Sequence, residues 1–206
     1  TIHNCIIESS GGSAAVHIRS DTAANEESTL ITSTLIQNNR NGGMDIGRDN
    51  VTLRDCTIAA NNGIGLWLSG LPAATNRWIE ACTIAYNTNN TFAAGVSMGG
   101  AAVFTNCLIA HNTATRGAGI YGIAGPTGQF YACTIASNRT SLEGGGGYIG
   151  FSADFDQCRI AGNRSDSKGG GMNIVNTVPG RVRLTRCWIN DNYAALGGGL
   201  CDEHGA

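Results

Sequence analysis

A short phrase beginning with cysteine recurs along the whole 206-residue chain and constrains its fold more than any other feature. In each full copy, isoleucine follows the cysteine by two positions and asparagine follows it by five. Successive copies lie 22 to 29 residues apart. A period of ~20 to 50 residues indicates a solenoid or another repeat array. The full copies begin at Cys56, Cys82, Cys107, Cys133, Cys158 and Cys187, and two looser copies begin at Cys5 and Thr34.

Each repeat contains three short extended segments and no helical periodicity. In one repeat these segments are residues 51–55, 56–58 and 65–68. Alternation within each segment directs one set of side chains inward: Val51, Leu53, Cys56, Ile58, Leu66 and Leu68. Three strands per ~26 residues, without long connections, predict an all-β, right-handed parallel β-helix. We expect one domain over residues 1–206, with about eight coils that are stable only together.

Stacking of coils places equivalent residues in columns along the axis. Cysteines are expected to fill a buried column as free thiols, because in-register neighbours are slightly too far apart for a relaxed disulfide. Cys201 lies off this column and is expected to face outward. An inward apolar column is predicted at Ile31, Leu53, Ile79, Phe104, Phe130, Phe155 and Leu184. Asparagine side chains are predicted to close a turn in αL geometry and to bond to one another at Asn39, Asn61, Asn87, Asn112, Asn138, Asn163 and Asn192.

The charge and hydropathy of the chain limit the kinds of partner that it can bind. Charged residues make up 14% of the sequence and the net charge is −2, so there is no electrostatic case for nucleic acid as a partner. No run of ~18 apolar residues predicts a membrane span. Because residue 1 begins inside a repeat, we expect either further coils outside these residues or copies that stack end to end.

Two patterns suggest cofactors but are explained by the repeat. The segment Gly117–Gly122 matches Gly-x-Gly-x-x-Gly, yet no helix is predicted after it, as a dinucleotide site requires. The histidines are scattered and no Cys-x-x-Cys pair is present, so Cys201 with His204 is only half a metal site. We therefore expect no metal and no cofactor.

The combination of Ile-x-x-Asn with Gly-Gly-(Gly/Ala)-aliphatic resembles two groups of bacterial β-helix repeats. These are the repeats of polymorphic outer-membrane proteins, which typically have phenylalanine where this chain has Ile58, and those of large anchored surface proteins. The resemblance implies a cell-surface or secreted scaffold or adhesin without enzymatic activity. Its partner would be a glycan or a host or neighbouring surface protein. The same fold also carries pectate lyases and polygalacturonases, so fold alone does not choose between them.

An enzyme of that kind would need a cluster of side chains on an outward strand face. Asp154 and Asp156 project from one face about 6.5 to 7 Å apart, a separation compatible with an inverting glycosidase pair. Stacking places Arg183 in the next coil, where a guanidinium suits the carboxylate of an acidic glycan. The alternative function is thus a polysaccharide lyase or glycoside hydrolase, although the residues favour an ordinary exposed face with a weak ion pair. The expected glycan-binding residues are Gln129 and Tyr131 beside this cluster, and Trp67 and Tyr121 in another outward column (His17, Asp45, Trp67, Ser97, Tyr121, Ile149, Asn173).

Small uncharged side chains follow the cysteines and predict a flat strip across several coils. Flat uncharged strips suit lateral association, although close packing at a corner would use the same residues. Threonine on a flat β-helix face also resembles ice-binding proteins, which leaves ice binding as a further alternative. The strip consists of Thr57, Thr83, Thr134, Ala59, Ala85, Ala110 and Ala136.

Overall fold

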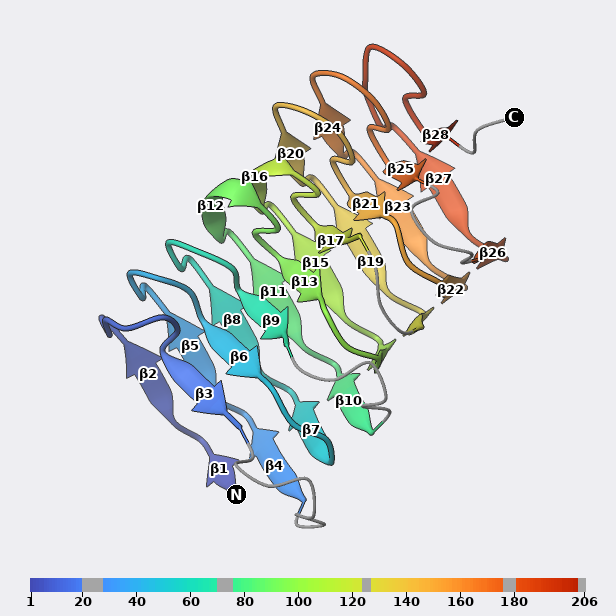
Figure 1. Ribbon diagram of the computed structural model, residues 1–206. Helices are drawn as coiled ribbons and strands as arrows, with labels where there is room; N and C mark the ends of the chain where they lie inside the picture. Colours follow the sequence, from blue (N-terminus) through green and yellow to red (C-terminus); the bar gives the residue numbers. More distant parts are fainter. Residues whose placement is uncertain (20–27, 70–75, 124–126, 176–180, 204–206) are drawn as a thin grey trace.

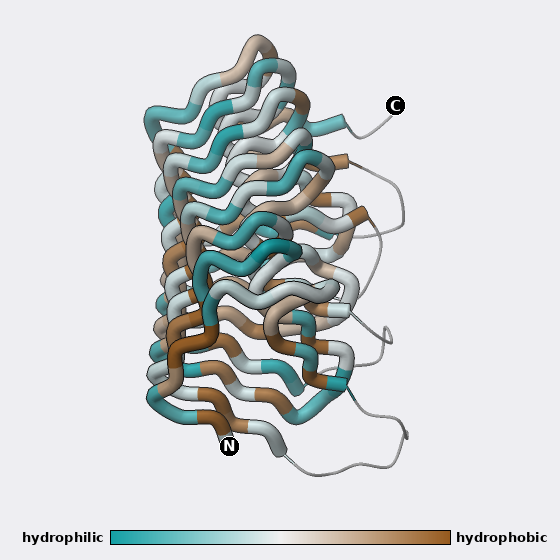
Figure 2. Tube along the Cα trace, turned by 90° about the vertical axis from the view of Figure 1, so that its left-hand side faces the viewer, coloured by the Kyte–Doolittle hydropathy of each residue, from teal (hydrophilic) through white to brown (hydrophobic). Residues whose placement is uncertain are grey.

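The computed structural model describes residues 1–19, 28–69, 76–123, 127–175 and 181–203. These residues form an all-β solenoid in which the chain visits three parallel sheets in turn (Figure 1). The turns of successive coils lie above one another from the N-terminus to the C-terminus (Figure 2). Within the described ranges, no helix is present that is long and apolar enough to cross a bilayer.

Each of the three main sheets has eight strands. Sheet A contains β1 (Ile2–His3), β4 (Thr29–Thr32), β7 (Val51–Arg54), β10 (Arg77–Glu80), β14 (Ala102–Thr105), β18 (Gly128–Tyr131), β22 (Ala153–Asp156) and β26 (Val182–Thr185). Sheet B contains β2 (Ile6–Glu8), β5 (Leu35–Gln37), β8 (Thr57–Ala59), β11 (Thr83–Ala85), β15 (Leu108–Ala110), β19 (Thr134–Ala136), β23 (Arg159–Ala161) and β27 (Trp188–Asn190). Sheet C contains β3 (Val16–Ile18), β6 (Met44–Ile46), β9 (Leu66–Leu68), β13 (Val96–Met98), β17 (Ile120–Gly122), β21 (Gly147–Ile149), β25 (Met172–Val175) and β28 (Leu200–Glu203).

The core forms as the repeat predicts. The apolar column of sheet A stacks in register from Ile31 to Leu184, and its phenylalanine rings lie in successive coils. The ring centroids of Phe104 and Phe130 are 4.8 Å apart, and those of Phe130 and Phe155 are 4.6 Å apart. Every inward residue of the repeat at 51–68 is buried. One continuous apolar rod therefore holds the coils together.

The asparagine ladder is confirmed, but its backbone geometry differs from the prediction. The side chains from Asn39 to Asn163 are buried, and each Nδ2 donates to the Oδ1 of the asparagine in the next coil. The residue before each asparagine adopts the positive φ instead, as Ala60 (53°) and His111 (56°) show. This preceding residue makes the bend, so the asparagine amide points inward and bonds to backbone that the bend leaves unpaired.

The cysteines are free thiols, as expected. Those from Cys56 to Cys158 are buried, and Cys107 Sγ donates to the Ile79 carbonyl oxygen at 3.2 Å. A hydrogen bond with the neighbouring thiol of Cys133, together with burial, raises the pKa of Cys107 to about 12. The prediction for Cys201 is wrong in part: it lies off the cysteine column, but its side chain is only 8% exposed. Cys201 occupies an outward position of sheet C that the neighbouring turn covers.

A fourth strand, absent from the prediction, occurs in the later coils. Sheet D has four strands: β12 (Thr88–Phe92), β16 (Thr113–Arg116), β20 (Arg139–Thr140) and β24 (Arg164–Ser165). They arise because the connection between the ladder asparagine and sheet C lengthens along the chain. It occupies residues 40–43 and 62–65 in two early coils, but 88–95 and 139–146 in later ones. The longer connections have room to pair with one another and to fold over sheet C.

Candidate functional site

The outward column of sheet C carries the most varied chemistry on the surface. Strand register places eight residues in it: His17, Asp45, Trp67, Ser97, Tyr121, Tyr148, Asn173 and Cys201. The prediction that Ile149 belongs to this column is wrong by one residue. Ile149 is fully buried in the core, and Tyr148 faces outward instead. Strand β21 therefore continues the alternation from Gly147, one position earlier than expected.

The later part of this column is covered by the long connections. The Phe92 ring stacks on Tyr121 with centroids 4.8 Å apart, and the Arg116 guanidinium lies 5.2 Å from the Tyr148 ring centroid. Tyr121 is consequently only 7% exposed, and burial raises the pKa of its hydroxyl. A sugar approaching this region meets Phe92, which is 47% exposed, before it meets Tyr121.

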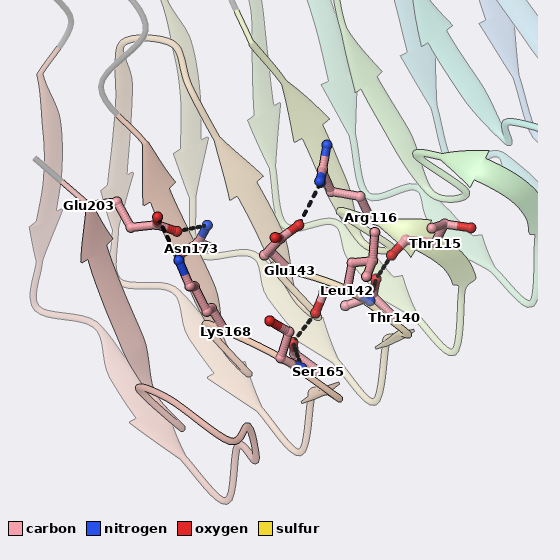
Figure 3. Close-up of polar contacts among 10 residues, drawn as sticks. Thr115, Arg116, Thr140, Leu142, Glu143, Ser165, Lys168, Asn173 and Glu203 are labelled. Atoms are coloured by element: carbon pink, nitrogen blue, oxygen red, sulfur yellow. Dashed lines mark hydrogen bonds and ion pairs between the residues drawn. The ribbon is translucent and has the colours of Figure 1, made fainter.

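Charged side chains continue the cover toward the C-terminal end (Figure 3). Arg116 Nε lies 2.6 Å from Glu143 Oε2 in the next coil. Lys168 Nζ lies 2.9 Å from Glu203 Oε2, and Asn173 Nδ2 donates to Glu203 Oε1 at 2.8 Å. Hydrogen bonding to Lys168 and Asn173 lowers the pKa of Glu203. Each of these contacts joins neighbouring coils, which is sufficient to explain them structurally.

The early part of the column has two exposed members, His17 and Trp67, and borders a recess of about 290 Å³. It lies where the short connections give way to β12, so the first long connection forms a ledge beside it. Trp67 is 39% exposed at this recess. The described residues that line it carry no formal charge and include Ser13, Asn41, Met44, Asn62, Trp67 and Asn89. We call this recess, together with the long connection that borders it, the Trp67 ledge.

The predicted acidic cluster lies on sheet A. Register pairs Asp154 with Gln129 on one side and Arg183 on the other, and Asp156 with Tyr131, as expected. Arg183 Nε is 3.9 Å from Asp154 Oδ1, a loose contact between partly exposed groups.

The sequence did not reveal that Arg186 belongs to this cluster. Arg186 Nε donates to Asp156 Oδ1 at 2.9 Å, and its Nη2 contacts the other carboxylate oxygen. Arg186 lies at a sheet corner with φ of 52°, where strand alternation does not predict the side-chain direction. The guanidinium lowers the pKa of Asp156. A glycosidase pair needs one carboxyl group that stays protonated, so this contact makes Asp156 less suited to the acid role.

The small-residue strip lies on sheet B in the expected register. Two of its alanines are recessed, since Ala85 and Ala110 are each 3% exposed, whereas Ala59 and Ala136 are partly exposed. Beside them, the Tyr86 and His111 rings stack at 4.8 Å with an interplanar angle of 4°. The middle of the strip is thus recessed at Ala85 and Ala110, and we call this part the alanine channel.

Metal-binding geometry is not found in the described part of the chain, where no three His, Cys, Asp or Glu residues lie close enough to hold an ion. His204, which with Cys201 makes only half a metal site in the sequence, lies outside the described residues.

Three stacked parallel sheets with an internal amide ladder define a parallel β-solenoid. The chain belongs to the right-handed β-helix family, whose model, described as "Right handed beta helix region", matches residues 1–75 and 70–205. Neither the curated proteins nor the solved structures contain a significant match to it. The family thus provides the fold and its hand, and no relative provides a ligand or an activity.

Proposed function

We propose that the chain is a rigid scaffold or adhesin of a bacterial surface or secreted protein, and that it binds neutral glycans at the Trp67 ledge. The observation that carries this proposal is an exposed tryptophan beside a recess with several amide side chains and no charge. An indole face binds the apolar face of a sugar ring, while amides donate to and accept from hydroxyl groups. The absence of charge among the described lining residues favours an uncharged sugar over an acidic one.

The solenoid suits such a role because it holds its surface side chains rigidly. Trp67 stands between Asp45 and Ser97 on neighbouring strands, and within β9 it is flanked by the buried Leu66 and Leu68. Ligand binding at a preformed site loses less conformational entropy than binding at a flexible loop.

Calorimetric titration with a panel of neutral and acidic oligosaccharides tests the proposal. We expect binding of a neutral member, lost in Trp67→Ala and retained in Trp188→Ala. Trp188 is the matched control because it is 66% exposed on sheet B, away from the ledge. Unchanged binding by Trp67→Ala, or binding of acidic members alone, would contradict the proposal.

Lateral association through the alanine channel is a second proposal, favoured by the recessed floor at Ala85 and Ala110. A protruding row of side chains from another copy would fill the channel and exclude water from its methyl groups. Substituting Ala110→Arg should abolish any concentration-dependent increase in mass measured by light scattering. An increase that persists in Ala110→Arg would assign association to another surface.

A further inference from the structure

A serine, a histidine and an aspartate lie in hydrogen-bonding order at the edge of the Trp67 ledge. Ser13 Oγ is 2.5 Å from His17 Nε2, and His17 Nδ1 is 3.2 Å from Asp45 Oδ2. Parallel register accounts for the second contact, since His17 on β3 pairs directly with Asp45 on β6. A hydroxyl, an imidazole and a carboxylate in this order form the nucleophile–base–orienter arrangement of covalent acyl transfer.

The carboxylate is held in place more firmly than a surface aspartate. Its side chain has no exposed area, Arg19 Nη2 contacts Oδ2 at 2.7 Å, and the Ser69 hydroxyl donates to Oδ1. With Asp45 fixed, the Nδ1 proton of His17 is directed toward the carboxylate. The lone pair of Nε2 then faces the Ser13 hydroxyl, as a general base requires.

Ser13 is exposed and lines the ledge, whereas the carboxylate lies behind the histidine. The turn before it is fixed by Gly12, which has φ of 122° and whose carbonyl oxygen accepts a hydrogen bond from Asn41 Nδ2 at 2.5 Å. The next residue, Ala14, also lines the ledge, and its amide N–H makes no hydrogen bond to the rest of the described chain. A free N–H directly after the nucleophile is suited to stabilise an oxyanion.

We propose that Ser13, His17 and Asp45 form a hydrolytic site for short acyl esters of neutral sugars. Ser13 and His17 are the catalytic residues and Asp45 is a positioning residue. The ester class follows from the arrangement of the three side chains, and the short acyl group follows from the small volume of the ledge. Only the sugar part of the substrate rests on the proposed glycan binding.

The reaction is balanced with water as the only co-reactant. Ser13 Oγ attacks the ester carbonyl carbon while His17 Nε2 takes its proton. The tetrahedral intermediate then expels the sugar oxygen, which receives that proton, and leaves the acyl group on Ser13. Water attacks the acyl carbon and gives a proton to Nε2, the bond to Oγ breaks, and Oγ recovers the proton as the carboxylic acid leaves.

The chain supplies a matched control for the histidine. His3 Nδ1 lies 2.6 Å from the Thr32 hydroxyl, and no carboxylate contact is found for His3 among the described residues. His3 and Thr32 thus reproduce the hydroxyl–imidazole contact without the orienting group. Ser10 is the control for the serine, since it lies in the same turn and its hydroxyl donates to the Glu8 carbonyl oxygen.

The test is hydrolysis of p-nitrophenyl acetate and of O-acetylated monosaccharides by the 206-residue chain, together with labelling by a fluorophosphonate located by mass spectrometry. We expect kcat/KM to fall by at least ~100-fold in Ser13→Ala and His17→Ala and to be unchanged in His3→Ala and Ser10→Ala. The label should be found on Ser13. Asp45→Asn should lower kcat and the labelling rate with little change in KM.

The proposal is overturned if hydrolysis does not exceed that of buffer, if Ser13→Ala retains the rate, or if the label is found elsewhere. Because Ser13 and His17 are exposed, their substitution is not expected to unfold the chain, and circular dichroism checks this. The outcome is separable from glycan binding. Hydrolysis of p-nitrophenyl acetate without sugar binding would refute the glycan proposal alone, and sugar binding by Ser13→Ala without hydrolysis by the parent chain would refute the triad alone.

Discussion

The early coils and the later coils have the same core and the same ladder, but they present different third faces. Where the connection after the ladder is short, Trp67 in the outward column of sheet C is exposed, although Asp45 beside it is buried by its own polar partners. Where it is long, Phe92, Arg116 and their successors cover that column, and Tyr121 becomes buried. The difference shows that a long connection can cover aromatic side chains that stay exposed beside a short one, as Tyr121 and Trp67 illustrate.

Substitutions at positions that the early and later coils share should lower the free energy of unfolding equally in both halves. The glycine before sheet C should be the most sensitive of these positions. A Cβ at Gly65 would lie 2.6 Å from Asn87 Nδ2, and one at Gly119 would meet the Gly146 carbonyl oxygen. We expect Gly65→Ala and Gly119→Ala each to lower the free energy of unfolding by about 4 kcal/mol, at the upper end for single substitutions.

Denaturant unfolding measures this loss, with Gly11→Ala as the control because nothing lies within 4 Å of its Cβ position. A loss of stability confined to one half would contradict the statement that both halves have the same core. It would mean that the coils approach one another differently in the two halves.

Substitutions in the asparagine ladder should give the next largest loss of stability. Asn61 in the open half and Asn138 in the covered half have the same set of hydrogen bonds to the coils before and after. Replacing either by alanine leaves buried donors and acceptors unpaired, at about 3 kcal/mol in total. Equal losses in denaturant unfolding would confirm that the ladder is independent of the third face. Asn90→Ala, at an exposed position of β12, should change stability by less than ~0.5 kcal/mol.

Phe92→Ala should affect the covered half alone. Loss of the stack on Tyr121 is expected to cost about 1 kcal/mol. Burial keeps the pKa of Tyr121 raised, so folding is favoured while the phenol is neutral. That contribution is present below about pH 10, the ordinary value, and is lost as pH rises through the raised pKa of the folded state.

Uncovering Tyr121 should therefore lower its pKa and reduce the alkaline loss of stability. Ultraviolet titration of the tyrosines measures the first effect, and unfolding as a function of pH measures the second. If the titration is the same with and without Phe92, another group covers Tyr121.

Trp67→Ala should have the smallest effect on stability, no more than about 1 kcal/mol, because no stacked ring contact is found for Trp67 in the described structure, unlike for Phe92. Thermal unfolding compares it with Phe92→Ala. A larger loss for Trp67→Ala than for Phe92→Ala would reverse the proposed contrast between an open face and a covered one.

The columns could be predicted because parallel, in-register stacking converts sequence spacing directly into position. This is why the core, the buried thiols and the register of Asp154 with Arg183 follow from the repeat alone. The lengthening from 62–65 to 88–95 was visible in the sequence as well, but not how the extra residues fold back over sheet C.

Corners and turns were harder to predict, since strand alternation does not apply to them. The contact of Arg186 with Asp156 and that of Ser13 with His17 both involve a side chain outside a strand. The same limit explains the αL residue, which precedes the ladder asparagine rather than being it. By contrast, the pairing of His17 with Asp45 was implicit in the predicted column.

The asparagine ladder also gives the solenoid a direction along its axis. In all six amide-to-amide hydrogen bonds, Nδ2 belongs to the earlier coil and Oδ1 to the later one. The amide dipoles therefore point the same way along the axis and polarise one another, as hydrogen bonds in a chain do. The ladder therefore ends with an amide oxygen at one end and with an amide N–H group at the other. The ladder is polar along the solenoid axis, whereas the apolar core is not.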